Sequence, residues 1–318
     1  MQSKIRDSAL ALGFLDARPA TGHPFDVWRK HLDTLPLGKG GFSLEHDLTK
    51  ATGWPLEEIT VWAAVAPAPP LEWPEGCGDI NGYYVMNTEP RKSRFDKWKE
   101  AVAALGYEIA KDARIPQRAA AIRAGLGVHG RNGLMITPGI GSLTYISILI
   151  LRAVPPPEAR GPEHDLNVDC GNCGACVKAC PAGAITTEGY DALRCLRSYM
   201  NRLHELPEDL YAAMGRRVIG CEDCQYACPH NAGVERMPPP TEMLEPMKLE
   251  NLLTTPDIER LAAYIPRYAA EHHPLKAQAC LAAANTGRKD LLPLVEAHIG
   301  CEDDLLDKIA RWAAERLR

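Results

Sequence analysis

The pattern of apolar positions predicts a first part that mixes helices and strands. Residues 4–15 and 95–105 carry apolar side chains at helical spacing, and 119–124 adds another helical stretch. Residues 59–66 and 143–152 are apolar runs rich in β-branched side chains, which is typical of buried strands. Strands and helices in mixed order predict a sheet covered by helices, that is, an α+β fold.

Past the prolines at 238–240 the pattern becomes helical and rich in Ala and Leu. Residues 275–284, 291–298 and 305–317 predict short helices, the first ending at 285–287. Such helices are typical of HEAT-type repeats, although a plain helical cap explains them equally well. With a proline-rich hinge at 155–157, we predict three domains, at residues 1–160, 161–237 and 238–318.

Composition and charge exclude some classes of protein. The longest apolar run, around 145–150, is interrupted by Arg152 and is too short to cross a membrane. The first residues lack the features of a secretory signal, which favours a cytoplasmic location. With a net charge of −5, any nucleic acid would have to bind a local basic surface. The basic stretch 91–131 could bind the phosphates of RNA or of a cofactor, but a solvated helix face explains it equally well.

Eight of the eleven cysteines lie between residues 170 and 228, which indicates a metal site rather than a disulfide framework. The first array, Cys170-Gly-Asn-Cys173-Gly-Ala-Cys176-Val-Lys-Ala-Cys180-Pro181, has the ligand spacing of bacterial ferredoxins. In that pattern three thiolates of one loop bind one [4Fe-4S] cluster. We expect the fourth cysteine to start a helix and to bind a second cluster.

The second array contains Cys221, Cys224 and Cys228-Pro229 and lacks one leading ligand, which Cys195 supplies. Structural zinc is the competing interpretation, but zinc sites rarely carry a C-x3-C-P tail in both halves. We interpret Cys280 as a buried apolar side chain and leave Cys301 without a role. For Cys77, in a loop rich in Pro and Gly, the approach to a cofactor is the minor alternative. By the ferredoxin exchange of ligands, cluster one takes Cys170, Cys173, Cys176 and Cys228, and cluster two takes Cys180, Cys195, Cys221 and Cys224.

The stretch 125–130 has the letters of the dinucleotide fingerprint G-x-G-x-x-G. That fingerprint must follow a strand and begin a helix, whereas these glycines end the predicted helix 119–124. We therefore exclude nicotinamide specificity and expect a loop whose backbone approaches a large cofactor closely.

Five segments carry a resemblance to a known family: 123–132 (RAGLGVHGRN), Gly141-Ser142, the first cysteine array, 191–195 (DALRC) and 220–231 (GCEDCQYACPHN). From about Ile109 onward, the sequence resembles the epoxyqueuosine reductases. The resemblance implies a nitroreductase-like α/β domain that binds base-off cobalamin, a ferredoxin-like module with two [4Fe-4S] clusters, and C-terminal HEAT-like helices. It also implies a low-potential electron donor of the ferredoxin or flavodoxin type, and the two-electron reduction of epoxyqueuosine in tRNA to queuosine.

The resemblance implies residue roles as well. Asp112 matches the position of the catalytic acid, which would need a raised pKa; its other interpretation is a cap of the helix that begins near Ile115. Contacts with the cofactor are expected from Arg118, Gly125, Gly127, His129, Gly130, Asn132, Gly141 and Ser142.

Some positions depart from the family's pattern. Residues 80–90 (INGYYVMNTEP) replace a segment that usually contains arginine and tyrosine, which leaves the substrate open. His129 and His230 replace apolar or aromatic residues, and either could bind cobalt or occupy a hydrogen-bonded packing position. Two other functions stay open: a paralogue that reduces another substrate or reactivates a corrinoid protein, and a ferredoxin-like electron carrier without corrinoid.

Overall fold

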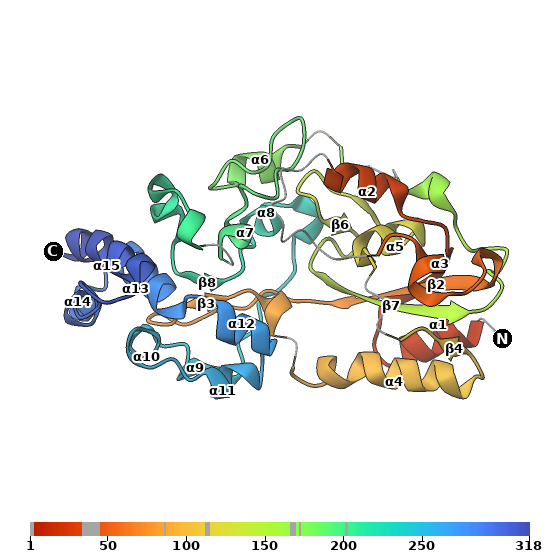
Figure 1. Ribbon diagram of the computed structural model, residues 1–318, viewed down its shortest axis with the longest axis horizontal. Helices are drawn as coiled ribbons and strands as arrows, with labels where there is room; N and C mark the ends of the chain where they lie inside the picture. Colours follow the sequence, from red (N-terminus) through yellow and green to blue (C-terminus); the bar gives the residue numbers. More distant parts are fainter. Residues whose placement is uncertain are drawn as a thin grey trace. The chain divides into compact units, whose positions relative to one another are not determined.

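The computed structural model describes residues 3–33, 45–85, 87–111, 115–165, 170–171, 173–200 and 203–318, without the side chains of 31–33. The chain forms two compact units (Figure 1). Unit 1 comprises Met1–Ala68 and Glu89–Cys173, and unit 2 comprises Pro69–Thr88 and Gly174–Arg318. Residues 69–88, which the sequence placed in the first predicted domain, thus pack with the second unit. The three-domain division stays a prediction.

Unit 1 is built on a sheet of four strands in the order β1-β2-β7-β4, with antiparallel neighbours. The strands are β1 (Asp16–Thr21), β2 (Ile59–Pro67), β7 (Thr144–Arg152) and β4 (Glu108–Ile109). In the register of the central pair, Val61 lies opposite Ile150. Strands β2 and β7 confirm the two strands predicted from the apolar runs.

Helices cover both faces of this sheet because β2 buries side chains on both sides. Its odd-numbered residues 59–65 share a core with α5 (Gln117–Arg123) and α3 (Leu48–Thr52). Trp62, Ala64 and Ala66 share a second core with α1 (Ser3–Ala11) and α4 (Arg91–Ala104). The predicted sheet between helices is therefore confirmed. Unit 1 also contains α2 (Asp26–Asp33) and a hairpin of β5 (Val128–His129) with β6 (Met135–Ile136).

Unit 2 consists of short helices and one small sheet, in which β3 (Asp79–Ile80) pairs in parallel with β8 (Arg217–Ile219). Three helices lie beside the cysteine arrays: α6 (Ala175–Ala179), α7 (Leu196–Met200) and α8 (Asp223–Tyr226). The C-terminal helices are α9 (Thr241–Leu244), α10 (Leu249–Thr254), α11 (Ile258–Ala262), α12 (Arg267–His272), α13 (Leu275–Asn285), α14 (Leu292–Glu296) and α15 (Asp304–Leu317).

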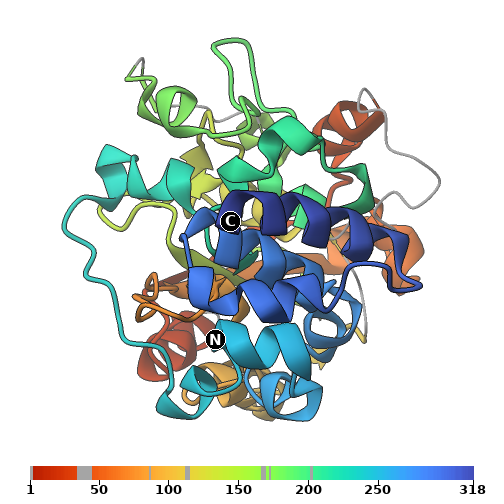
Figure 2. The same ribbon diagram turned by 90° about the vertical axis from the view of Figure 1, so that its left-hand side faces the viewer.

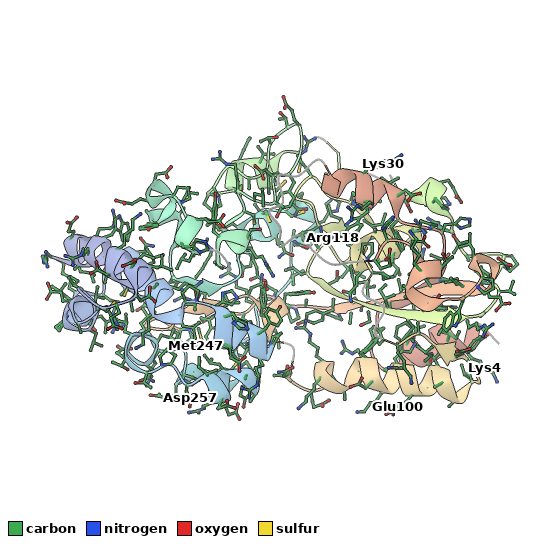
Figure 3. All side chains as sticks on the ribbon, in the orientation of Figure 1. Lys4, Lys30, Glu100, Arg118, Met247 and Asp257 are labelled. Atoms are coloured by element: carbon green, nitrogen blue, oxygen red, sulfur yellow. The ribbon has the colours of Figure 1, made fainter. Side chains whose placement is uncertain are left out.

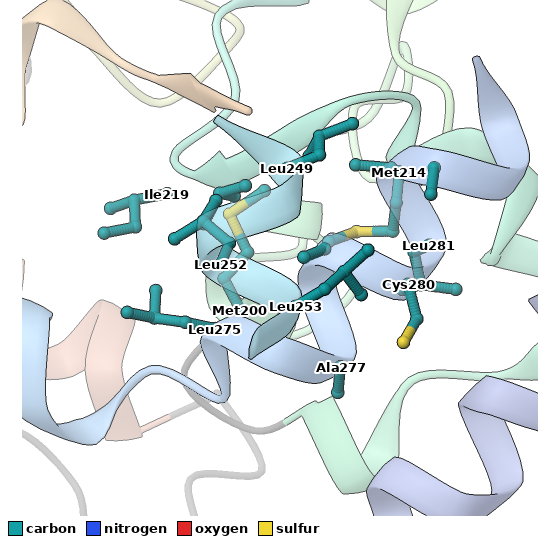
Figure 4. Packing of buried hydrophobic residues seen from close by; sticks show 14 of the residues in the cluster. Met200, Met214, Ile219, Leu249, Leu252, Leu253, Leu275, Ala277, Cys280 and Leu281 are labelled. Atoms are coloured by element: carbon teal, nitrogen blue, oxygen red, sulfur yellow. The ribbon is translucent and has the colours of Figure 1, made fainter. Parts of the chain in front are cut away.

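Helix α13 lies in the middle of the core of unit 2. Nine of its eleven residues are buried, so it is apolar on almost every side and packs against α10, α15 and β8. Figure 4 shows Leu275 and Leu281 of this helix among Met200, Ile219 and Leu252. In Figure 2 the C-terminal helices, drawn in blue, lie side by side. The cysteine module and the terminal helices thus share one core, and the helices predicted at 275–284, 291–298 and 305–317 are confirmed; their HEAT-like character stays a prediction.

Among the helices of the described ranges, none has the length and apolar character that a membrane span requires.

Candidate functional site

All eleven cysteines lie in the described ranges, and all of them are free thiols. Cys170 and Cys173 belong to unit 1, whereas Cys176, Cys180, Cys195, Cys221, Cys224 and Cys228 belong to unit 2. No disulfide framework is therefore formed by these residues. Within the described part of the chain, no three Cys, His, Asp or Glu side chains are grouped so that they could hold a single metal ion.

The four cysteines expected to hold cluster two lie near one another in unit 2. Cys180 follows α6, Cys195 precedes α7, and Cys221 and Cys224 lie on either side of the start of α8, which packs against α6. The thiol of Cys224 interacts electrostatically with those of Cys221, Cys195 and Cys180, and also with that of Cys176. Cysteines more than forty positions apart in the chain thus interact electrostatically.

Burial keeps two of these thiols protonated. It raises the pKa of Cys221 to about 12, against the opposing effect of the Arg217 guanidinium. Burial also raises the pKa of Cys224, and the neighbouring thiols raise it further. A buried thiol binds metal only as the thiolate, so loading of such a site releases protons.

The structure corrects the expectation that Cys180 starts a helix. Cys180 instead follows the last residue of α6, with an extended backbone at φ −72° and ψ 110°. The reason is Pro181, because the residue before a proline is disfavoured in the helical conformation. Cys228, which precedes Pro229, has a similar extended backbone at ψ 122°.

The backbone N–H groups of Ala184 and Arg131 donate hydrogen bonds to cysteine sulfurs. In unit 2, the N–H of Ala184 lies 3.2 Å from Sγ of Cys180. In unit 1, the N–H of Arg131 lies 3.3 Å from Sγ of Cys170, which ties the β5–β6 hairpin to the first cysteine of the array. Hydrogen bonds of this kind are among the groups by which a protein tunes an iron-sulfur cluster.

The glycine loop follows a helix, as the sequence predicts. Helix α5 ends at Arg123, and Gly125 then adopts the left-handed conformation at φ 78°. A side chain on Gly127 would place its Cβ 2.6 Å from the carbonyl oxygen of Ile136, and one on Gly130 would lie 2.7 Å from Oδ1 of Asn132. The packing of the loop itself therefore requires these glycines.

The other residues expected to contact a cofactor lie in the same loop system of unit 1, between α5 and β7. Asn132 is buried and accepts a hydrogen bond from the N–H of Leu134, and Gly141 exchanges two backbone hydrogen bonds with Thr137. Ser142 is buried just before β7. Arg118, labelled in Figure 3, is exposed on α5 and donates to the carbonyl of Gly133.

A buried ion pair that sequence reasoning missed holds this loop system in place. Arg123 is completely buried, and its guanidinium binds both carboxylate oxygens of Asp165. The backbone oxygen of Asp165 lies 3.2 Å from Nε2 of His129. His129 therefore has a hydrogen-bond partner, as its interpretation as a packing residue requires. Arg123 lies within the glycine-loop motif, but nothing in its sequence surroundings identified Asp165.

Asp112 lies outside the described residues. The N-cap of α5 is Pro116, and among the described residues no side chain caps this helix.

Residues 80–85, the first part of the segment that departs from the family's pattern, belong to unit 2 and lie beside the second cysteine array. The N–H of Asn81 donates to the carbonyl of Ile219, and a side chain on Gly220 would lie 2.4 Å from Cβ of Asn81. Farther along, Tyr84 is buried below the guanidinium of Arg197. The segment therefore lies against the strand that leads into Cys221.

Unit 2 also contains His230 and the three cysteines outside the arrays, Cys77, Cys280 and Cys301. Cys280 is completely buried in α13, which agrees with the apolar interpretation. Cys77 is buried with its Sγ 3.6 Å from the carbonyl oxygen of Leu244, and Cys301 is half-buried. His230 is exposed in the turn after Cys228.

Comparison with known proteins finds one matching family model and several relatives named epoxyqueuosine reductase. The family described as "4Fe-4S double cluster binding domain" matches residues 169–231. An epoxyqueuosine reductase of Bacillus anthracis is 35% identical over 146 residues, which cover 44% of this chain and 37% of that protein. The epoxyqueuosine reductase of Vibrio cholerae is 29% identical over 249 residues, covering 73% of this chain and 64% of that protein.

The fold is also shared with a solved structure. The crystal structure of an epoxyqueuosine reductase with a tRNA-Tyr epoxyqueuosine-modified tRNA stem loop matches with a TM-score of 0.78 at 21% identity, covering 99% of this chain and 90% of that one. The chain's sequence matches span less than two thirds of these curated relatives' length.

Proposed function

Because the chain resembles epoxyqueuosine reductases in sequence and shares their fold, we propose that it is an oxidoreductase that reduces epoxyqueuosine in tRNA to queuosine. The observation that carries this proposal is the electrostatic interaction of Cys224 with Cys180, Cys195 and Cys221, all within the segment that matches the double cluster family. The likeness to a reductase solved with a tRNA stem loop supports tRNA as the substrate.

The cysteine thiolates would hold two [4Fe-4S] clusters, which supply electrons at low potential when bound. Cys224 interacts electrostatically with the three other free thiols, and four cysteine sulfurs are the donor set that a cluster of this type takes. The N–H groups of Arg131 and Ala184 would bond to sulfurs of Cys170 and Cys180 in the loaded protein. Cluster one would use Cys170, Cys173, Cys176 and Cys228, and cluster two Cys180, Cys195, Cys221 and Cys224.

Base-off cobalamin would bind at the loop system between α5 and β7, and when bound it supplies a strong reductant and nucleophile. An orphaned buried atom supports a polar ligand there: within the described residues, Oγ1 of Thr137 has no hydrogen-bond partner. Its backbone is bonded to Gly141, one of the expected contacts. The binding residues would be Arg118, Gly125, Gly127, His129, Gly130, Asn132, Gly141 and Ser142.

Removal of an epoxide oxygen requires an acid for the departing oxygen, and Asp112 is the proposed donor of that proton. To be protonated at neutral pH, its carboxyl group would need a pKa raised by burial beside the cofactor. Electrons would come from a donor of the ferredoxin or flavodoxin type. Eleven free thiols support a reducing compartment such as the cytoplasm.

A paralogue with another substrate, or one that reactivates a corrinoid protein, is the second candidate. It is favoured by one observation: Ile80 and Asn81, at the start of the departing segment, pair with the strand that leads to Cys221. A change at this position alters the surroundings of the second array without removing any cysteine.

Anaerobic reconstitution with iron, sulfide and hydroxocobalamin, followed by metal counting and a nucleoside assay on epoxyqueuosine-containing tRNA, tests the proposal. We expect both clusters and one corrinoid per chain, turnover by the wild type, and loss of turnover in Asp112→Asn with its cofactors retained. A fully loaded wild type without turnover would favour the paralogue. Failure to retain cobalamin would leave a ferredoxin-like electron carrier, and absence of iron would overturn the proposal.

A further inference from the structure

A positively charged patch lies at the edge of the sheet of unit 1, where β1 is the outermost strand. We call it the β1 patch, and it consists of Arg6, Arg18 and Arg160 around Asp16. Arg6 belongs to α1 and Arg18 to β1. Arg160 lies beyond the end of β7, and its backbone forms an isolated bridge with Ala20 of β1. Residues from three separate parts of the sequence therefore form the patch.

Positive charge exceeds negative charge in the β1 patch because one carboxylate is shared by two arginines. Nε of Arg6 lies 2.8 Å from Oδ1 of Asp16, and Nε of Arg18 lies 2.8 Å from Oδ2 of the same side chain. Within the described residues no carboxylate forms an ion pair with Arg160, since the neighbouring Glu163 contacts the adjacent histidine instead. Three arginines and one carboxylate leave a surplus of two positive charges.

Two of these guanidinium groups are held at Gly125. Nη1 of Arg18 donates to the carbonyl oxygen of Gly125 at 2.9 Å. A Cβ added to Gly125 would lie 2.6 Å from Nη1 and 2.7 Å from Cζ of Arg160, so that guanidinium packs directly on the α-carbon of the glycine. Two cations held against one residue repel each other, and an anion bound to both relieves this repulsion.

Resting on the proposed function, we propose that the β1 patch binds phosphate groups of the RNA backbone. A guanidinium presents its N–H groups as a planar fork that matches the oxygens of a phosphate. Contacts with phosphates set the position of a nucleic acid and do not depend on its sequence. Because the whole chain has a net charge of −5, the attraction for RNA has to come from a local surface of this kind.

Arg152 at the end of β7 provides a matched control in the same unit. It is exposed like Arg18, with 45% and 46% of the two side chains accessible. Its guanidinium lies 2.8 Å from Glu58 and 3.5 Å from Glu108, so carboxylates outnumber the cation there. Arg152→Gln thus removes an arginine from a place that has no surplus of positive charge.

The test is the affinity of the reconstituted protein for full-length tRNA, measured as a function of salt concentration. Loss of one phosphate contact lowers the slope of log affinity against log salt by roughly 0.7 to 0.9. We expect this decrease in Arg160→Gln and in Arg18→Gln, and a larger one in the double variant. Arg160→Lys, which keeps the charge, and Arg152→Gln should both keep the slope of the wild type.

Asp16→Asn removes the carboxylate of the patch and should therefore bind tRNA more tightly than the wild type. A misfolded variant cannot produce such a gain, so this variant decides the matter if Arg160→Gln or Arg18→Gln fails to fold. Weaker or unchanged binding by Asp16→Asn would then overturn the inference.

Slopes equal to that of the wild type in Arg160→Gln and Arg18→Gln would also overturn the inference. So would loss of the corrinoid from Arg160→Gln at an unchanged slope, because the anion would then be the phosphate of the cofactor rather than that of RNA. A wild type that binds tRNA with the expected dependence on these residues, but does not reduce epoxyqueuosine, would overturn the proposed function and support the inference.

Discussion

The guanidinium of Arg123 and the carboxylate of Asp165 form a two-point ion pair inside unit 1, with Nε–Oδ1 and Nη2–Oδ2 distances of 2.7 Å. The same guanidinium donates to the carbonyl of Pro24 and lies 4.0 Å from the ring centre of Phe25. One side chain therefore connects α5, the loop after β1 and the segment that precedes Cys170.

Replacement of Arg123 by Met should destabilise unit 1 by about 3–5 kcal/mol, because it leaves a buried carboxylate without its partner. Thermal unfolding of cofactor-free protein measures the loss. The double variant Arg123→Met/Asp165→Leu should recover part of the stability, since no buried charge remains. Arg118→Met, which removes an exposed arginine of the same helix, is the control. Equal melting temperatures for the single and double variants would contradict the explanation.

Mild acid should destabilise unit 2 through His273. Burial, helped by the nearby Arg197, lowers the pKa of this histidine to about 4, whereas an unfolded histidine has a pKa of about 6.5. Between these values the unfolded chain binds a proton that the folded chain does not. Stability therefore falls as the pH falls through this window, by up to about 1.4 kcal/mol per pH unit.

The dependence of the melting temperature on pH checks this prediction. His273→Gln should flatten the slope between about pH 6.5 and about pH 5. This range lies between the folded and the unfolded pKa of His273. His272→Gln, at the exposed neighbouring position, should keep the slope of the wild type. Identical slopes in both variants would show that His273 does not control the effect.

Cys224→Ala should lose about half of the iron, because it removes one ligand of cluster two and leaves those of cluster one. Cys280→Ala is the matched control, since Cys280 is buried in the apolar core of α13. Iron and sulfide analysis after anaerobic reconstitution measures both variants. Full iron content in Cys224→Ala would refute the assignment of this ligand.

Gly127→Ala should destabilise the β5–β6 hairpin by roughly 1–3 kcal/mol, as expected for overpacking. Its Cβ would lie 2.6 Å from the carbonyl oxygen of Ile136, a backbone atom that has little room to move. At Gly189 an added Cβ meets nothing within 4 Å, so Gly189→Ala should melt like the wild type. A wild-type melting temperature for Gly127→Ala would show that packing does not require this glycine.

The sheet of unit 1 was predictable only where burial determines the residue types. Strands β2 and β7 are central and apolar, so their runs were visible in the sequence. Strand β1 was not predicted, because its sequence, DARPAT, lacks an apolar pattern. Its place at the edge of the sheet tolerates Pro19, and its strand structure depends on pairing with β2.

The double cluster pattern could be recognised from the sequence because its cysteines are spaced locally. Contacts between residues far apart in the chain could not be recognised in this way. Arg123 and Asp165 are 42 positions apart, and nothing near either residue indicates the other. Strand β3 is only two residues long, which is too short for any periodicity. The ligand assignments, the cofactor contacts and the role of Asp112 stay predictions.

The pairing of β3 with β8 has a consequence for biosynthesis. Asp79 and its partner Arg216 are 137 positions apart, so residues 69–88 emerge from the ribosome long before the strand they pair with. Most of the other unit is translated in between. The surroundings of Cys221 and Cys224 can therefore mature only late in translation, and a fragment excised at 161–237 would leave one edge of β8 without its native neighbour.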